Sequence, residues 1–284
     1  MPCAAGFSKR IGWRAALCSR GVMLGAPVTI YFHEVPGGPR ELTLFGAPVP
    51  DGWHALDRSS LHPGLAFDAH CDALADEVRA LAGAAPIRLV GFSLGTFIAL
   101  QVAHRLPDLP LTIDLISAAA PLQTGDYLDH MAGKPVFAAA TRSPALFGAM
   151  AAGQALAARL APTRLAAALF ASAQGEDRAL AGNAAFQCTM AMILRHGLSH
   201  GRINYMREIA AYVGDWASIL SDIRHPVTLW HGAEDNWSPS AMAEVLAKRL
   251  PDVVALHRMP DLSHYSTLGA YLDALPAGNT ARNG

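Results

Sequence analysis

The sequence is poor in residues that build metal sites or disulfide frameworks. Only four of the 284 residues are cysteine, and their positions show no CxxC or other metal-ligand spacing: Cys3, Cys18, Cys71 and Cys188. We therefore expect free thiols in a reducing compartment instead of a disulfide framework. We also expect no metal and no other cofactor.

Charge is also scarce. Charged residues make up 16% of the chain and the formal net charge is −1, so no global field favours nucleic acid or an anionic membrane. Hydrophobic residues make up 52%, a composition that can bury a sizeable core and excludes a disordered chain. The 12 histidines matter more for function, because each is a candidate acid, base or ligand near neutral pH.

No hydrophobic run is long enough to cross a bilayer. The longest uncharged stretch, residues 143–158, is shorter than the roughly 20 residues that a membrane-spanning helix needs. Near the N-terminus, Arg14 and Arg20 interrupt any apolar run that follows Lys9 and Arg10, so we expect no secretory signal. We predict a cytoplasmic protein without a membrane span. We find no internal repeat and no low-complexity linker.

Strand-like and helix-like segments alternate along much of the chain. Short apolar runs with β-branched and aromatic residues predict strands at 28–32, 53–56, 87–90, 111–117, 226–230 and 253–258. Apolar residues at helical spacing predict helices at 67–82, 96–106 and 241–250. This alternation predicts an α/β fold, with a mostly parallel sheet between layers of helices.

The middle of the chain has a different character. Residues 121–212 are rich in alanine and methionine, show helical periodicity and carry few strand signals. We therefore expect an α/β core, formed by residues 1–120 and 213–284, that is interrupted by a helical insertion at 121–212.

One short motif carries the strongest chemical signal. Residues 91–95 read GFSLG, a G-x-S-x-G pattern that follows a predicted strand and opens a predicted helix. In so tight a turn, side chains two residues before or after Ser93 would collide with their neighbours, which explains Gly91 and Gly95. The hydroxyl of Ser93 would then stand clear as a nucleophile. The alternative is an ordinary glycine-rich turn, such as one that cradles a phosphate at a helix N-terminus.

A serine hydroxyl needs a base to take its proton, and the base needs an orienting acid. Asp235 follows the predicted strand 226–230, and His264 follows the strand 253–258. Together with Ser93 they would stand at the carboxyl ends of parallel strands, where such sheets bind ligands. The alternatives are that Asp235 is a turn residue with Glu234 as the acid, or that His264 is a loop residue with a structural role.

These motifs resemble those of the α/β-hydrolase fold family. The family order is nucleophile, acid, histidine, and this chain matches it with GFSLG, HGAEDNWSP and LSHYS. The resemblance implies an α/β-hydrolase fold, a Ser93–His264–Asp235 triad, and a helical cap at the insertion. A serine in the GFSLG turn argues against the dehalogenases and epoxide hydrolases of this fold, which use an aspartate there.

The loop after the first predicted strand departs from the family pattern. The family commonly has His-Gly-x-Pro-Gly, whereas this chain has HEVPG, so Glu34 replaces the expected glycine after His33. The resemblance implies that the backbone N–H groups of Val35 and Leu94 form an oxyanion hole. His-Glu is not a zinc motif here, because no second histidine follows at the required spacing.

A carboxylate beside an oxyanion hole requires an explanation. We expect Arg40 or Arg58 to hold Glu34 in an ion pair that braces the loop, and we regard Glu34 and His33 as residues that modulate the site. The alternatives are a direct role for Glu34, such as orienting a water or binding a cationic substrate group, or a damaged oxyanion hole.

The predicted function is a serine hydrolase that acts on a carboxylic ester or related acyl compound. The Ala-, Met- and Leu-rich insertion favours a mainly apolar pocket and a small-molecule acyl substrate. The alternatives are an acyltransferase with the same triad and a hydrolase-like protein that binds a small molecule without turnover. The sequence does not indicate an oligomeric state. Only 27 residues precede the strand at 28–32, so the family's first two strands are short, irregular or partly missing.

Overall fold

A single parallel sheet forms the centre of the protein, whose computed structural model describes residues 26–275. The spatial order of the strands is β2-β1-β3-β4-β5-β6, and every neighbouring pair runs parallel. In chain order the strands are β1 (Val28–Phe32), β2 (Trp53–Ala55), β3 (Ile87–Phe92), β4 (Leu111–Ile116), β5 (Val227–Gly232) and β6 (Val253–Met259). The predicted α/β fold is thus confirmed, and the strand ends differ from the predicted ones by at most two residues at either end.

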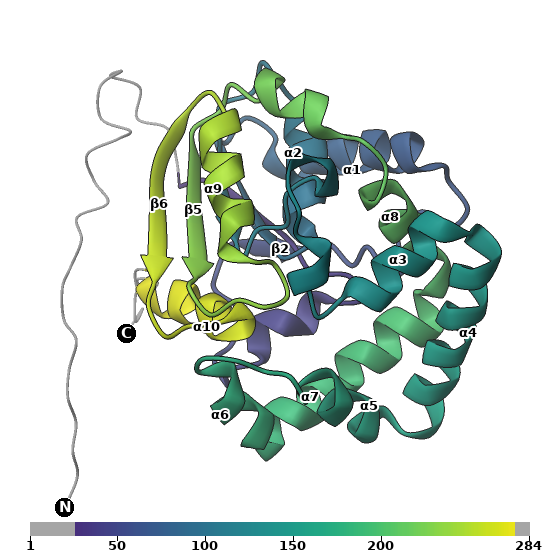
Figure 1. The fold of residues 1–284 in the computed structure, drawn as a ribbon. Helices are drawn as coiled ribbons and strands as arrows, with labels where there is room; N and C mark the ends of the chain where they lie inside the picture. The colour runs from purple at the N-terminus through teal and green to yellow at the C-terminus, as the bar shows by residue number, and fades with distance from the viewer. Residues whose placement is uncertain (1–25, 276–284) are drawn as a thin grey trace, which may run out of the picture.

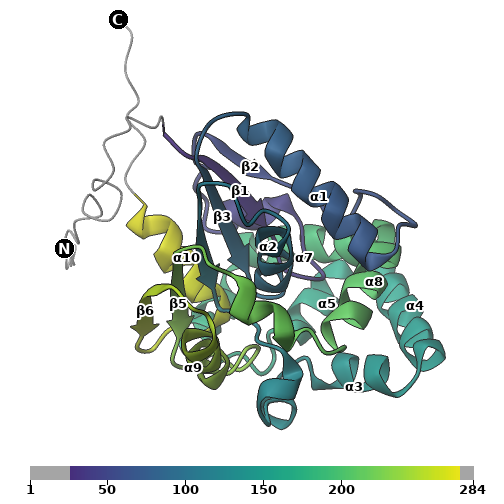
Figure 2. The ribbon, with the colours of Figure 1, turned by 90° about the horizontal axis from the view of Figure 1, so that it is seen from above.

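Helices cover both faces of this sheet (Figures 1 and 2). The helices α1 (Phe67–Ala82), α2 (Gly95–His104) and α9 (Ser240–Arg249) pack on one face, and α10 (His264–Ala274) packs on the other. On the α10 face, Tyr271 donates a hydrogen bond to Asp114 at 2.8 Å, and Nε of Arg88 donates to the same carboxylate at 2.7 Å. These bonds anchor the helix that begins at His264.

In the described chain, every regular element between β4 and β5 is a helix. The α-helices are α3 (Lys134–Arg142), α4 (Pro144–Leu160), α5 (Pro162–Leu169), α6 (Asp177–Gly182), α7 (Ala184–Arg195) and α8 (Arg202–Tyr212). Shorter helical turns are η1 (Pro39–Thr43) in the loop after β1, then η2 (Leu122–Thr124), η3 (Leu128–His130), η4 (His196–His200) and η5 (Ala217–Asp222). Figure 1 shows α5, α6 and α7 below the arrowheads of β5 and β6. The division of the chain at 121 and 212 into a core and a cap stays a prediction.

The register of the sheet brings the loops of the site to one edge. Phe32 at the end of β1 pairs with Gly91, while Phe92 at the end of β3 pairs with Ile116 at the end of β4. Ile116 in turn pairs with Trp230, close to the end of β5. Parallel strands in this register deliver their following loops to the same place, which is where open α/β sheets bind ligands.

The predictions about the cysteines and the N-terminal strands concern some residues that lie outside the described part of the chain. Cys71 is a buried free thiol and Cys188 an exposed one, whereas Cys3 and Cys18 lie outside the described residues. The prediction about the family's first two strands falls mostly on residues 1–25, which also lie outside them. Within the described part of the chain, none of the helices is both long and apolar enough to cross a bilayer.

Candidate active site

Ser93 lies in the tight turn between β3 and α2. Its backbone φ is +56°, a left-handed conformation that is strained for a residue with a side chain. A Cβ atom added to Gly91 would lie 2.8 Å from the carbonyl oxygen of Gly95, and one added to Gly95 would collide with the carbonyl of Phe32. Crowding therefore requires both glycines, as the sequence predicts for this motif.

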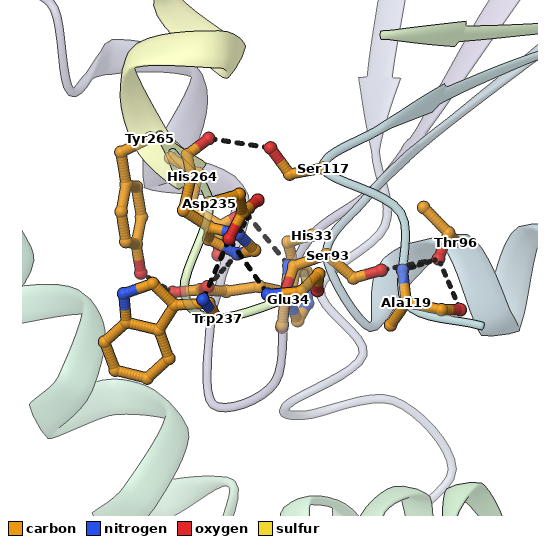
Figure 3. A network of polar contacts seen from close by, with 12 residues as sticks. His33, Glu34, Ser93, Thr96, Ser117, Ala119, Asp235, Trp237, His264 and Tyr265 are labelled. Carbon is orange, nitrogen blue, oxygen red and sulfur yellow. Dashed lines mark hydrogen bonds and ion pairs between the residues drawn. The ribbon is translucent and has the colours of Figure 1, made fainter. Parts of the chain in front are cut away.

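The helix that follows Ser93 holds the turn in place. The Thr96 hydroxyl donates to the carbonyl oxygen of Ser93 at 2.6 Å and accepts the N–H of Ala119 at 3.1 Å (Figure 3). Among the described residues, no partner binds the hydroxyl of Ser93 itself, and this side chain faces a pocket. The backbone of Ser93 is thus fixed while its hydroxyl stays available.

Asp235 lies in the loop between β5 and α9. Its Oδ1 accepts the backbone N–H groups of Trp237 and Ser238 at 2.8 and 2.9 Å, and its Oδ2 lies 2.8 Å from Nδ1 of His264. Burial disfavours the charged form, but the charge and hydrogen bond of His264 outweigh it and lower the pKa of Asp235. Asp235 is thus an ionised carboxylate that orients the imidazole.

His264 is the first residue of α10 and is buried. Its carbonyl oxygen accepts the hydroxyl of Ser117 at 2.9 Å, and its ring centroid lies 4.9 Å from that of Phe92. Because Nδ1 donates its hydrogen to Asp235, Nε2 carries the free lone pair of the neutral ring, and Nε2 has no hydrogen-bond partner among residues 26–275. Burial lowers the pKa of His264, but nearby carboxylates, Asp235 first, outweigh burial and raise it.

A carboxylate from the insertion supports the helix of His264. Asp177, in the first turn of α6, accepts the backbone N–H groups of Tyr265 at 3.0 Å and Ser266 at 2.7 Å. These amides belong to the first turn of α10, where the backbone N–H groups have no carbonyl acceptor within the helix itself. Burial raises the pKa of Asp177. The insertion thus helps to set the position of His264.

Glu34 points toward the same histidine (Figure 3). One carboxylate oxygen accepts the hydroxyl of Tyr265, and the other lies 3.8 Å from Nε2 of His264. Burial raises the pKa of Glu34 to about 7, although the charge of His264 and the hydrogen bond from Tyr265 act in the opposite direction.

The predicted ion pair between Glu34 and an arginine is wrong. Arg58 is buried and pairs with Glu208 of α8, with Nη2 and Oε2 3.0 Å apart. Arg40 is exposed, and no ion pair joins it to Glu34 in the described structure. A closer partner for Glu34, the phenol of Tyr265, takes the place of the arginine because α10 brings it to the loop.

A second buried carboxyl group, Glu41 of η1, holds the backbone of the loop. It accepts the N–H of Glu34 at 3.1 Å, the N–H of Gly38 at 3.1 Å and the hydroxyl of Tyr31 at 2.8 Å. Burial raises the pKa of Glu41 well above its ordinary value. A Cβ atom on Gly37 would collide with this side chain, which explains the glycine.

His33 is a structural part of the loop. Its Nε2 accepts the backbone N–H of Arg58 at 3.1 Å, so Nδ1 carries the hydrogen and donates to the carbonyl of Glu34 at 2.6 Å. Burial and the charge of Arg58 lower the pKa of His33 to about 3, which keeps the ring neutral. It ties the loop after β1 to the loop after β2.

Val35 and Leu94 both line the pocket that Ser93 faces. Within the described residues, neither backbone N–H donates to a protein acceptor. Leu94 follows Ser93 at the start of α2, so its amide belongs to the positive end of that helix. The two amides are therefore free to bind a negatively charged oxygen.

The pocket is mainly apolar. It encloses about 780 Å³ of space that no atom fills, including the solvent at its mouth. Ser93 and Glu34 lie in its wall, and the insertion contributes most of the apolar side chains, among them Leu165, Leu194 and Ile209. Polar side chains are few, and two of them bind each other: the Tyr205 hydroxyl donates a hydrogen bond to Gln154 at 3.0 Å. Such a pocket suits a compact apolar ligand.

Three further residues close to the site in sequence have structural roles. Glu234 has an exposed side chain, and its carbonyl accepts the hydroxyl of Ser263. His231 donates from Nε2 to the carbonyl of Ser238 at 2.7 Å, and Asp261 occupies a turn with φ of +64°. No group of three metal-ligating side chains capable of holding an ion occurs in residues 26–275.

Sequence reasoning missed three residues that shape the site: Glu41, Asp177 and Glu208. Their partners are Gly38, Tyr265 and Arg58, the last two being far away in sequence. Asp177 starts a short helix in an alanine-rich segment, a position at which a carboxylate normally interacts with its own helix. The only weak signal is that all three are acids in otherwise apolar surroundings, where an unpaired carboxylate is costly.

Comparison with known proteins agrees with the observed fold. Residues 53–270 match the family model described as alpha/beta hydrolase fold. A curated relative, the pimeloyl-[acyl-carrier protein] methyl ester esterase of Aromatoleum aromaticum, is 52% identical over 50 residues. That match covers 18% of this chain and 20% of the relative, so the chain matches about a fifth of the relative's length.

Several solved structures share the fold at low identity. A bromoperoxidase from Bacillus anthracis superimposes with a TM-score of 0.63 at 17% identity, covering 88% of this chain and 90% of that one. A thermophilic esterase from Thermogutta terrifontis gives a TM-score of 0.61 at 18% identity, with 88% of each chain covered. An enol-lactonase from Burkholderia xenovorans LB400 gives 0.60 at 15% identity, covering 88% of this chain and 89% of that one. The family match extends over more than half of the sequence, and the chain belongs to the α/β-hydrolase fold family.

Proposed function

We propose that this protein is a serine hydrolase that cleaves a carboxylic ester or a related acyl compound through an acyl-enzyme intermediate. The observation that carries the proposal is the 2.8 Å contact between Asp235 and His264 beside a pocket that Ser93 faces. This contact leaves Nε2 of His264 as the basic nitrogen of the neutral ring. A strained serine, an oriented imidazole and a buried carboxylate are the three groups that such chemistry requires.

In the proposed reaction, His264 takes the proton of the Ser93 hydroxyl as the oxygen attacks the acyl carbon. Asp235 stabilises the imidazolium that forms, and His264 then gives the proton to the departing alcohol. Water attacks the acyl-enzyme in the second half of the cycle, again with His264 as the base. The products are a carboxylic acid and an alcohol, and Ser93 is regenerated.

The free backbone N–H groups of Val35 and Leu94 supply the oxyanion hole in this proposal. Both residues line the pocket with Ser93, and neither amide is committed to another protein acceptor in the described structure. Donors of this kind stabilise charge that develops on the carbonyl oxygen in the transition state. Each such donor is worth about a hundredfold to a thousandfold in kcat.

The pocket supports an apolar acyl group as the preferred substrate. In the proposal the helices of residues 121–212 act as a cap, since Leu165, Leu194 and Ile209 of that segment line the pocket. The methyl ester esterase and the Thermogutta esterase are both named for ester hydrolysis, which supports the reaction class. The short match to the methyl ester esterase does not carry over its substrate.

Turnover of p-nitrophenyl butyrate by the wild type and by Ser93→Ala tests the proposal. We expect the wild type to release p-nitrophenol and Ser93→Ala to lose at least about a thousandfold in kcat. Ser221→Ala is the matched control, because Ser221 is an exposed serine that does not line the pocket. It should retain wild-type activity.

Product analysis separates the neighbouring functions. Release of free butyrate in the presence of added alcohols supports hydrolysis, whereas transfer of the butyryl group to the alcohol would identify an acyltransferase. Tight retention of the ester without release of product would identify a binding protein. Full activity of Ser93→Ala would overturn the proposed nucleophile.

A further inference from the structure

Glu34 occupies a place in the site for which the proposed mechanism has no role. One of its carboxylate oxygens lies 3.8 Å from Nε2 of His264, and the other accepts the hydroxyl of Tyr265. The side chain is 9% exposed and lies in the wall of the same pocket as Ser93. The hydrogen bond from Tyr265 therefore fixes Glu34 beside the catalytic histidine.

The imidazole of His264 thus lies between two carboxylates. Asp235 binds Nδ1 at 2.8 Å, and Glu34 lies on the side of Nε2. An opposite charge within about 4–6 Å favours the charged form of a titratable group. Ionised Glu34 therefore favours a proton on Nε2, the nitrogen that must be bare to accept the proton of Ser93.

We propose that Glu34 is a positioning residue that acts through His264: when ionised, it stabilises the proton on Nε2 in competition with Ser93 and thereby shifts catalysis toward neutral and alkaline pH. This inference rests on the proposed function, because it assumes that His264 is the base for Ser93. The same charge makes His264 a stronger base once its proton has left, which favours proton transfer from a weakly acidic hydroxyl.

The other carboxylates near His264 are held by contacts that do not involve the Glu34 side chain. Asp177 and Asp235 each bind two backbone N–H groups, and Glu41 binds the backbone of Glu34 itself. His231 lies 3.7 Å from Asp235. The Tyr265 hydroxyl binds Glu34 directly, and the buried phenol of Tyr31 is close enough to interact with its charge. All of these groups remain when Glu34 alone is changed, so a substitution of Glu34 isolates its charge.

Protonation equilibria agree with the geometry. Burial raises the pKa of Glu34 to about 7, and the charges of Asp235, Glu34 and Asp177 raise the pKa of His264 against the effect of burial. Ionised Glu34 is therefore one of the charges that hold the proton on His264. As pH rises, Glu34 ionises, and the charge it gains delays the loss of the proton from His264.

Glu34→Gln tests the proposal, because it removes the charge and keeps an oxygen that can accept the Tyr265 hydroxyl. The readouts are kcat/KM for p-nitrophenyl butyrate and the rate of fluorophosphonate labelling of Ser93, from about pH 5 to about pH 9. We expect the acidic limb of both profiles to move down by about one pH unit. At a pH below the wild-type limb, the variant should then react about tenfold faster than the wild type.

Glu176→Gln is the matched control, because Glu176 is an exposed glutamate that does not line the pocket. Its profiles should coincide with those of the wild type. An active Glu34→Gln protein whose acidic limb does not move would overturn the proposal and leave Glu34 as loop support.

Tyr265→Phe is the second variant if Glu34→Gln does not fold. It removes the hydrogen bond that stabilises ionised Glu34, so the acidic limb of its pH profiles should also move to lower pH. An acidic limb that does not move would overturn the proposal.

NMR titration of isotope-labelled histidine measures the pKa of His264 without any substrate. We expect this pKa to fall by about one unit in Glu34→Gln. An unchanged value would overturn the proposal even if the esterase assay fails. Conversely, a protein in which the pKa of His264 shifts while Ser93 neither labels nor turns over would refute the proposed function alone.

Discussion

Oδ2 of Asp235 lies 2.8 Å from Nδ1 of His264 and only 3.7 Å from Nε2 of a second buried histidine, His231. The second imidazole donates its Nε2 hydrogen to the carbonyl of Ser238 at 2.7 Å, which leaves the carboxylate to His264. The backbone amides of Trp237 and Ser238 hold the other carboxylate oxygen. The carboxylate of Asp235 is therefore held by three hydrogen bonds, one of which joins it to Nδ1 of His264.

Asp235→Asn should lower kcat by about a thousandfold to ten-thousandfold, because an amide cannot stabilise the imidazolium and favours the wrong tautomer. Steady-state kinetics with p-nitrophenyl butyrate measures this loss. The adjacent exposed Glu234 provides the control. A large loss in Glu234→Gln together with an active Asp235→Asn would show that the acid has been assigned to the wrong residue.

The ion pair between Arg58 and Glu208 should be important for stability. Both side chains are almost fully buried, at 0% and 4% exposure, so Glu208→Gln would leave the charge of Arg58 without its partner. Breaking a buried pair in this way costs about 3–5 kcal/mol in the free energy of unfolding. Urea denaturation measures the change. The exposed pair Arg258–Glu244 is the control, and Glu244→Gln should change stability by less than about 1 kcal/mol.

The contribution of Glu208 should depend on pH. Burial raises its pKa, but the charges and hydrogen bonds of Arg58 and His70 together outweigh burial and lower the pKa from 4.5 to about 2. A carboxyl group with a lowered folded-state pKa stabilises the fold fully above its unfolded-state pKa and loses that effect as pH falls toward its folded-state pKa. The stability difference between the wild type and Glu208→Gln should therefore be constant above about pH 5 and shrink as the pH falls toward about 2. A difference that grows on acidification would contradict the assignment.

Asp177 should influence both stability and catalysis from outside the reacting groups. Asp177→Ala removes an acceptor for two amides in the first turn of α10. Loss of a helix cap costs about 0.5–2 kcal/mol, and His264 begins the affected helix. We expect a lower free energy of unfolding and a lower kcat, measured by urea denaturation and ester turnover. Glu176→Ala, at the exposed neighbouring position, should change neither.

Two glycines should respond oppositely to alanine. Gly95→Ala places a Cβ against the backbone carbonyls of Phe32 and His33, which cannot move without disturbing β1. We expect this variant to be unfolded or strongly destabilised. Gly153 lies within α4 with open space where a Cβ would be, so Gly153→Ala should raise the free energy of unfolding by up to about 1 kcal/mol. Thermal melts of both proteins test this contrast, and a well-folded Gly95→Ala would refute the crowding argument.

The order of strands and helices was predictable because each core element carries its own local pattern. The strand at Val28–Phe32 and the helix at Phe67–Ala82 agree with the structure at both ends, since an apolar run and a helical apolar stripe are properties of neighbouring residues. The relation of Asp235 to His264 was also accessible, because the family motifs fix the chain order and the loops in which these residues occur.

The surroundings of Glu34 were not predictable in the same way. Its hydroxyl partner, Tyr265, is 231 residues away, and the carboxylate that pairs with Arg58 is 150 residues away. Arginines close in sequence looked like natural partners, but Arg58 is buried against α8, where Glu208 satisfies it. Such pairings follow from the tertiary packing of segments that are distant in sequence, and no local pattern in the sequence encodes that packing.

Mass spectrometry locates the nucleophile after the 284-residue protein reacts with a fluorophosphonate. We expect one adduct, on the peptide that contains Ser93, and no adduct in Ser93→Ala. We also expect slower labelling in Asp235→Asn, because the reagent reports the activated serine and not a particular substrate. An adduct on another serine such as Ser117 or Ser238, or no adduct on folded wild-type protein, would contradict the account.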